Sequence, residues 1–169
     1  MNTGKSNQEG RSVAEQTEHN ITGWVGQRPG GPKHISRGQT FKILREAEIN
    51  RVEVFTELVM HPGTVTLTLH KYDPESGSWG PELTKVSTSL TSANDGMWLG
   101  FEVPKLHVVK DGTYGLRIES QDSYFGVGEA AGSANRPPIA VGQEWIFSEN
   151  NPLKAFKYFS LSFKVKAVA

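Results

Sequence analysis

The sequence contains no cysteine among its 169 residues, which excludes disulfide bridges, a thiol nucleophile and a thiolate metal site. It also lacks an excess of either charge, because 18 lysines and arginines balance 18 aspartates and glutamates. A neutral chain gives no electrostatic reason to expect nucleic acid or an anionic membrane as a partner. No apolar run approaches the length of a membrane span, so membrane insertion is not expected either.

The first residues, 1–8, are polar and carry no apolar segment of signal-peptide length. Two interpretations of the compartment stay open: a cytosolic protein, or a mature or excised form of an exported one. Residues 1–36 are rich in glycine, glutamine, asparagine and serine, which predicts a polar N-terminal arm before a folded domain at 37–169. Such an arm could lie on its own domain or contact a neighbouring subunit, which would allow self-association.

From Gly38 onward the chain shows a regular alternation of apolar and polar residues. In "TVTLTLHKY" the residues Val65, Leu67 and Leu69 face one way, and the same period recurs in "QTFKIL", "WLGFEV", "TYGLRIES" and "YFSLSFKVKAV". Alternation with a period of two predicts strands that are buried on one face, as in antiparallel sheets. Glycine, proline, asparagine and aspartate mark the turns between them. The sequence therefore predicts an all-β, antiparallel two-sheet β-sandwich of jelly-roll type with an irregular N-terminal arm, a closed barrel being the alternative.

Motifs for metal binding and catalysis are scarce. No two of the five histidines have the short spacing of a zinc pair, and the sequence has no G-x-S-x-G, no H-E-x-x-H and no phosphate-binding glycine loop. We therefore predict a protein that is not an enzyme and has no cofactor. A structural calcium ion is the alternative, since several oxygen ligands lie in turns, although such residues favour turns for local reasons. These residues are Asp73, Glu75, Asn94, Asp95 and Asp111.

Most aromatic residues follow the strand alternation and are predicted to lie in the core, and Trp98 at a strand start is placed there as well. Three others break the pattern. Trp79 lies in a polar turn, while Tyr124 and Trp145 flank "YFGVGEAAGSANRPPIAVGQEW", a long loop of small residues and prolines. An aromatic residue in a loop either folds back as a cover on the sandwich or awaits a partner, and both interpretations stay open.

The residue types in this segment suit a carbohydrate site. Tyrosine and tryptophan rings can stack on the apolar C–H faces of sugars, while carboxylate, amide and guanidinium groups can bind the hydroxyls. Glycines let the backbone approach a ligand closely, and prolines stiffen the loop. The predicted ligand-binding residues are Tyr124, Glu129, Asn135, Arg136, Trp145 and Trp79.

Four motifs follow one another in order across residues 38–166: "GQTF", "TVTLTLHKYDPESGSWGPELTKVSTS", "DGTYGLRIES" and "EWIFSENNPLKAFKYFSLSFKV". This order resembles the non-catalytic β-sandwich modules of bacterial surface and secreted proteins known as choice-of-anchor domains. It is similar, more loosely, to jelly-roll carbohydrate-binding modules. The resemblance implies a sandwich fold, an extracellular or cell-surface location and an accessory role.

Two functions from different classes follow as hypotheses. The first is a non-catalytic binding module that recognises carbohydrate, a polysaccharide or glycan, through loops at one end of the sandwich. The second is a structural or assembly subunit of a surface layer, appendage or virus particle that uses the N-terminal arm for subunit contacts. A hydrolase ranks third, because no pair of carboxylates stands out as the two catalytic groups that a glycosidase needs.

Overall fold

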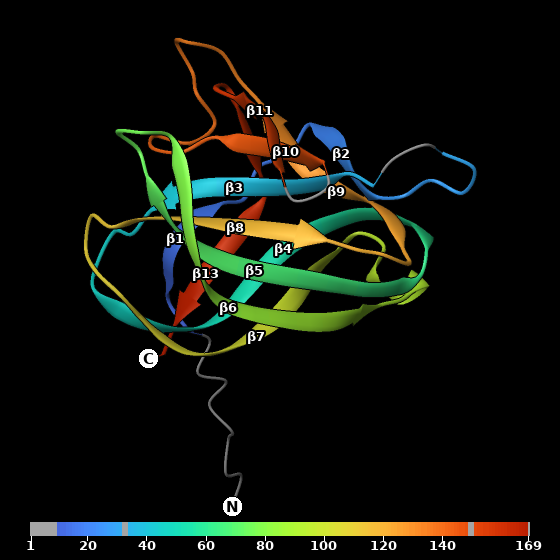
Figure 1. The fold of residues 1–169 in the computed structure, drawn as a ribbon, viewed down its shortest axis with the longest axis horizontal. Helices are drawn as coiled ribbons and strands as arrows, with labels where there is room; N and C mark the ends of the chain where they lie inside the picture. Colours follow the sequence, from blue (N-terminus) through green and yellow to red (C-terminus); the bar gives the residue numbers. More distant parts are fainter. Residues whose placement is uncertain (1–9, 32–33, 149–150, 169) are drawn as a thin grey trace, which may run out of the picture.

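The computed structural model describes residues 10–31, 34–148 and 151–168 (Figure 1). Their regular elements are strands, apart from the short 3₁₀ segment η1 (Ser92–Asn94). The strands form two antiparallel sheets packed face to face, which confirms the predicted β-sandwich. In the part of the chain that the structure describes, no helix has the length and apolar character needed to cross a lipid bilayer.

The first sheet has seven strands, and β1 and β12 lie at the two ends of its main path. Two further strands branch from it, since β2 pairs with β9 and β7 pairs with β4. In spatial order the main path is β1 (Ser12–Gln16), β13 (Phe163–Ala167), β4 (Ala47–His61), β9 (Tyr124–Ala131) and β12 (Phe159–Leu161), joined by β2 (Ile21–Gly26) and β7 (Met97–Val108).

The second sheet has six strands, and the long hairpin of β5 and β6 forms one of its edges (Figure 1). Its spatial order is β11 (Asn151–Phe156), β10 (Glu144–Ser148), β3 (Ser36–Lys42), β8 (Thr113–Glu119), β5 (Gly63–Asp73) and β6 (Ser78–Leu90). Strand β10 pairs with β3 through Trp145 opposite Gly38, and this register decides which side chains share a face.

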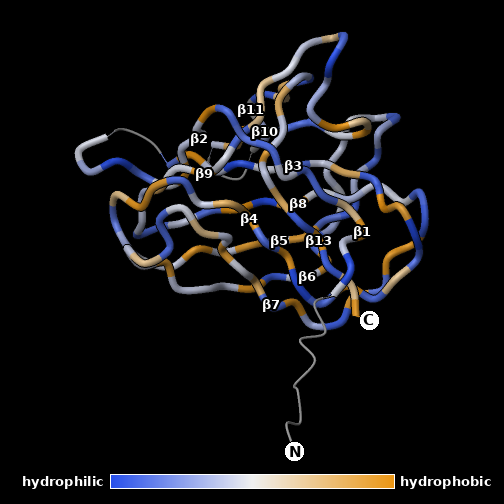
Figure 2. Tube along the Cα trace, turned by 180° about the vertical axis from the view of Figure 1, so that it is seen from behind, coloured by the Kyte–Doolittle hydropathy of each residue, from blue (hydrophilic) through white to orange (hydrophobic). Residues whose placement is uncertain are grey.

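The core lies between the two sheets and follows the alternation read from the sequence, which Figure 2 shows as hydrophobic and hydrophilic residues alternating along the strands. Val65, Leu67 and Leu69 of β5 are at most 1% exposed. Phe41 and Phe163 meet across the core with ring centroids 5.5 Å apart. At roughly 25 cal/mol per Å² of apolar surface removed from water, this interior is the main source of the stability of the fold.

The structure differs from the sequence-based expectation for the N-terminal segment. Residues 12–16 and 21–26, expected within a polar arm, form β1 and β2 of the seven-stranded sheet. Val13 and Val25 are fully buried. Each of these strands is short and pairs with a strand far along the chain, β1 with β13 and β2 with β9. Local composition therefore gives little indication that the two segments form strands.

The structure also shortens the expected long loop. Its first part, residues 124–131, is strand β9, and Trp145 lies within β10, so the connection runs from 132 to 143. Inward-facing Phe125, Val127 and Glu129 alternate with outward-facing glycines in "YFGVGEAA". The small outward residues conceal this alternation in the sequence, which is why the composition of the segment predicts a loop.

Candidate functional site

Trp79 and Trp145, two of the predicted ligand-binding residues, lie together on the outer face of the six-stranded sheet. Their ring centroids are 5.9 Å apart and their planes are almost perpendicular, at 89°. Tyr72 contacts both indoles edge-on with centroids 6.0 Å away, and Phe147 contacts Trp79 at 5.0 Å. The structure thus brings these two predicted residues into one aromatic cluster.

This cluster is closed packing rather than an open platform. Trp79 lies flat on the sheet because Gly38 and Gly115, on adjacent strands, have no side chains beneath it; a Cβ at Gly38 would come within 2.9 Å of the indole. The indole Nε1 atoms of Trp79 and Trp145 are both buried and have no hydrogen-bond partner among the described residues. A ligand cannot reach these groups without moving the cluster, so the position of Trp79 agrees with a cover on the sandwich.

A small hollow adjoins the cluster beside Tyr72. Burial raises the pKa of the Tyr72 hydroxyl, while a hydrogen bond with Gln143 acts in the opposite direction. The hollow measures about 210 Å³, below the roughly 300–1,000 Å³ typical of ligand sites. This part of the surface is therefore a poor candidate for binding a sugar.

Tyr124 lies on β9 of the seven-stranded sheet, whereas Trp79 and Trp145 lie on the six-stranded sheet. Strand β2 pairs with β9 so that Trp24 is opposite Gly126 and Gly26 is opposite Tyr124. The rings of Trp24 and Tyr124 stack with centroids 4.9 Å apart and an angle of 18° between their planes. Both side chains are half-buried, so part of each ring faces outward. The sequence does not predict this stacked pair, because Trp24 falls in the segment expected to be a polar arm.

The rings of Trp24 and Tyr124 form one wall of a hollow of about 690 Å³, which we call the Trp24–Tyr124 hollow. This volume falls within the range of small-molecule sites. The other walls are backbone, aliphatic groups and one exposed guanidinium. The lining residues are Trp24, Gly26, Arg28, Pro29, Gly30, Gly31, Ile35 and Tyr124.

The turn at this hollow depends on glycine. Gly26 has φ of 100°, a left-handed conformation that residues with a side chain rarely adopt, and a Cβ there would collide with the carbonyl of Ser123. The backbones of Gly26 and Ile35 exchange two hydrogen bonds, of 2.8 and 3.0 Å, which close the neck of the loop. The loop that carries Arg28 is therefore anchored at its base against the sheet.

Glu129 lies inside the sandwich and cannot serve as the surface ligand group that the sequence suggested. It is 5% exposed, because on β9 it faces opposite to Tyr124. Arg37 Nη1 donates to Glu129 Oε2 at 3.0 Å and to Glu144 Oε2 at 2.8 Å. Arg37 Nε donates to the Trp24 carbonyl at 3.0 Å. This group joins both sheets and fixes the backbone beneath the Trp24–Tyr124 hollow.

The buried group of Arg37, Glu129 and Glu144 contains one positive and two acidic side chains, so the balance of charge determines which carboxyl group is protonated. Burial of Glu144, which is 0% exposed, and the neighbouring Glu129 carboxylate raise the pKa of Glu144 to about 9, against the opposing effect of Arg37. Glu144 therefore keeps its proton at neutral pH, while Glu129 pairs with the guanidinium. The buried network is then electrically neutral, as a low-dielectric interior requires.

Asn135 and Arg136 are exposed at the start of the connection between β9 and β10. Ser133 and Arg136 exchange backbone hydrogen bonds of 3.1 Å, which make a tight turn. Arg136 lines a third hollow, of about 660 Å³, here called the Arg136 hollow. Its lining residues are Thr17, Glu18, His19, Asn20, Ala130, Ala131, Gly132, Ser133, Arg136, Pro137 and Pro138.

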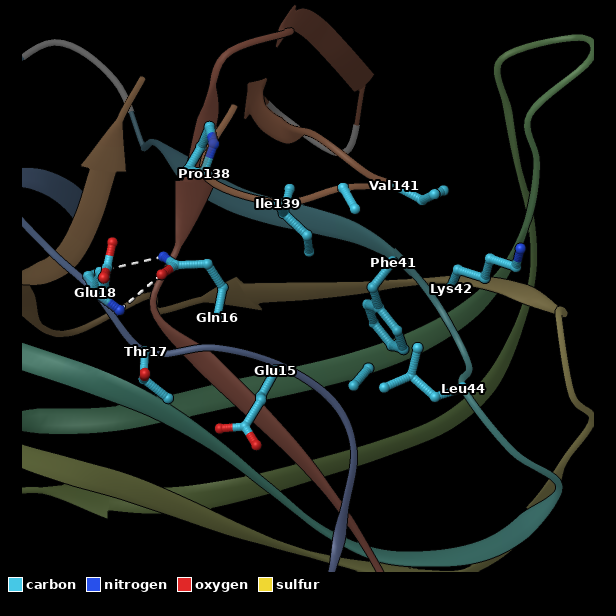
Figure 3. A pocket seen from close by; sticks show the side chains of 12 residues that line it. Glu15, Gln16, Thr17, Glu18, Phe41, Lys42, Leu44, Pro138, Ile139 and Val141 are labelled. Carbon is cyan, nitrogen blue, oxygen red and sulfur yellow. Dashed lines mark hydrogen bonds between the residues drawn. The ribbon is translucent and has the colours of Figure 1, made fainter. Parts of the chain in front are cut away.

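A fourth depression, of about 470 Å³, lies between residues 14–18 and the segment 138–141 (Figure 3). Gln16 spans the backbone of Glu18, donating to its carbonyl at 2.8 Å and accepting from its N–H at 2.6 Å. The aromatic ring that lines this cleft belongs to Phe41, which is only 2% exposed. The cleft lacks the open ring that makes the Trp24–Tyr124 hollow suitable for a sugar.

The turn residues considered for calcium do not assemble into a cluster. Across residues 10–31, 34–148 and 151–168, no three histidine, aspartate or glutamate side chains come together as a metal site would require. Asp73 Oδ1 instead accepts the backbone N–H of Glu75 at 3.0 Å, and Asp95 binds the N–H of Val59. These carboxylates therefore bind backbone and turn groups.

No protein-family model and no curated protein matches this sequence. The fold is similar to the crystal structure of the cysteine protease and lectin-like domains of Cwp84, a surface layer associated protein of Clostridium difficile. That match has a TM-score of 0.51 and 11% sequence identity and covers 79% of this chain and 32% of the other. Clostridial cysteine protease Cwp84 after propeptide cleavage matches with a TM-score of 0.50 and 11% identity, over 79% of this chain and 36% of that one.

This chain therefore spans about a third of the length of those two structures. At 11% identity the likeness shows a shared fold and nothing finer. The architecture agrees with the resemblance to surface β-sandwich modules that the motif order suggests.

Proposed function

We propose that this chain is a non-catalytic carbohydrate-binding module that works at a cell surface, with the Trp24–Tyr124 hollow as its binding site. The observation that carries the proposal is the hollow itself, which combines two half-exposed stacked rings, glycine backbone and the Arg28 guanidinium in about 690 Å³.

The chemistry of this hollow matches that of a sugar. A pyranose presents C–H groups on its faces, which pack on the outward parts of the Trp24 and Tyr124 rings. Its hydroxyls accept hydrogen bonds from Arg28, and also from backbone N–H groups of the glycine-containing turn, where no Cβ holds the ligand away. The rings stack on each other and need no reordering on binding, so little conformational entropy is lost.

The comparisons support the class of function. The name of the similar Clostridium difficile protein includes a lectin-like domain and an association with the surface layer. Its name also includes a cysteine protease, a chemistry that the present sequence cannot provide because it contains no cysteine. The close carboxylate pair of Glu129 and Glu144 lies inside the sandwich, where a glycosidic bond cannot reach it. A binding role without catalysis fits these observations best.

Isothermal titration calorimetry and affinity-gel electrophoresis against soluble polysaccharides test the proposal with the wild-type chain and the Trp24→Ala and Tyr124→Ala variants. Loss of one stacking ring should weaken binding at least tenfold, since each well-packed aromatic contact is a dominant part of a small interface. Tyr158→Ala is the matched control, because Tyr158 lines neither hollow. Binding that survives both ring variants unchanged would contradict the proposed site.

A further inference from the structure

The Trp24–Tyr124 hollow and the Arg136 hollow lie at opposite ends of the same pair of strands, β2 and β9. The register places Thr22 opposite Gly128, Trp24 opposite Gly126 and Gly26 opposite Tyr124. Because side chains alternate along a strand, these residues all face outward on the seven-stranded sheet. The two hollows therefore open on one face of the molecule.

The distance between them follows from the strand geometry. The ladder continues past the end of β2, since the Asn20 N–H donates to the Glu129 carbonyl at 3.0 Å. Asn20, which lines the Arg136 hollow, is four residues from Trp24, or about 13 Å at roughly 3.3 Å per residue. A single sugar ring cannot fill both hollows, but a chain of several sugars can.

The surface between the hollows carries the exposed side chain of Thr22 and several rings. Gly126 and Gly128 contribute no side chains, so their neighbours lie flat on β9. Trp24 leans over Gly126, while Phe55 lies against Gly128. His19 stacks on Phe55 with centroids 4.4 Å apart and planes at 17°. Flat rings thus recur along the strip from the Trp24–Tyr124 hollow toward the Arg136 hollow.

The far end of this surface, at the Arg136 hollow, offers a charged side chain that has no side-chain partner among the described residues. Arg136 is exposed and makes no ion pair with another described residue. The Asn20 side chain, by contrast, is occupied, because it bonds both backbone groups of Ala131 at 3.0 and 3.3 Å. The Arg136 guanidinium is therefore available at this end to bind hydroxyl or carboxylate oxygens.

We propose, building on the proposed function, that the ligand is an internal stretch of an extended polysaccharide that runs along β2 and β9 from the Trp24–Tyr124 hollow to the Arg136 hollow. One sugar stacks at Trp24 and Tyr124, the chain passes over Thr22, Phe55 and His19, which cover Gly126 and Gly128, and Arg136 binds a sugar further along. The surface along β2 and β9 between the two hollows makes the affinity depend on the length of the sugar chain, whereas the stacked rings of Trp24 and Tyr124 provide the main binding contact.

Calorimetric titration with chito-oligosaccharides and with oligogalacturonides, each from the disaccharide to the hexasaccharide, tests the proposal. At least one series should bind with an affinity that rises with length until the chain spans both hollows. Arg136→Ala should weaken the longest ligands about tenfold, as expected for one lost charge-assisted hydrogen bond, and leave the disaccharide unchanged. Arg45→Ala is the matched control, because Arg45 is an exposed arginine outside both hollows.

The outcomes separate the two proposals. Affinity that depends on Trp24 but is the same for every length, or an Arg136→Ala effect that is equal at every length, overturns the extended track and leaves the proposed function standing. Absence of binding by the wild-type chain to both series overturns both.

Discussion

Replacing Glu144 by glutamine should stabilise the protein at neutral pH and flatten the dependence of its stability on pH. Glutamine keeps the shape of the side chain and an oxygen that can accept from Arg37, 2.8 Å away in the native protein. The change removes only the ability of this buried group to ionise. Gln39, opposite Glu144 in the β-ladder and fully buried, adds no charge to the site.

The direction in which the free energy of unfolding changes with pH follows from proton linkage. The pKa of Glu144 is about 9 in the folded protein and near 4.5 in the unfolded chain. Between these values the folded state holds a proton that the unfolded state has lost, so the free energy of unfolding falls as pH rises and levels off above pH 9. At roughly 1.4 kcal/mol per pKa unit, the effect at neutral pH is on the order of 3 kcal/mol as an upper limit.

Urea denaturation at about pH 5 and about pH 8 measures this effect, with the linkage slope as the readout. The wild-type chain should lose stability between the two conditions, while Glu144→Gln should lose much less. Glu102→Gln is the control, because Glu102 is an exposed glutamate of β7. Parallel curves for the wild type and Glu144→Gln would refute the reasoning about the buried proton.

Three further substitutions test other parts of the structure. Gly115→Ala places a methyl group inside the Trp79 ring position and should lower the free energy of unfolding by about 1–3 kcal/mol, measured by thermal or urea denaturation. Gly26→Ala forces a side chain into φ of 100° against the Ser123 carbonyl, so it should both destabilise the fold and weaken sugar binding in calorimetry. Arg37→Met leaves the buried Glu129 carboxylate, beside the protonated Glu144, without its cation and should cost about 3–5 kcal/mol by denaturation. A stability equal to that of the wild type in any of the three would show that the corresponding contact has been misjudged.

The sequence predicted those parts of the fold in which the alternation is strong and the strand partner is close. Val65, Leu67 and Leu69 belong to an unbroken period of two, and β5 pairs with β6 through a short turn. Trp24 could not be found in the same way. Its strand has six residues, and its position depends on pairing with β9, about a hundred residues further along the chain.

The candidate site was predicted in composition but not in arrangement. The sequence analysis names Tyr124 as an aromatic outside the strand alternation, and in the structure its ring stacks on Trp24 rather than on Trp145. Glu129 was assigned to a surface loop because the glycines around it hid the alternation that turns it inward. Trp98 was expected in the core but lies half-buried on the outer face, where Lys164 stacks over its ring at 4.3 Å. The face on which each of these side chains lies depends on how the strands pair, which local sequence does not specify.

The central claim is that the stacked rings of Trp24 and Tyr124 bind carbohydrate. Calorimetric titration of Trp24→Ala, with circular dichroism to show that the variant keeps its fold, tests this most directly. We predict a folded variant whose affinity for the polysaccharide bound by the wild type falls at least tenfold, as the loss of a principal stacking ring implies. A folded variant that binds the same polysaccharide as tightly as the wild type would contradict the claim.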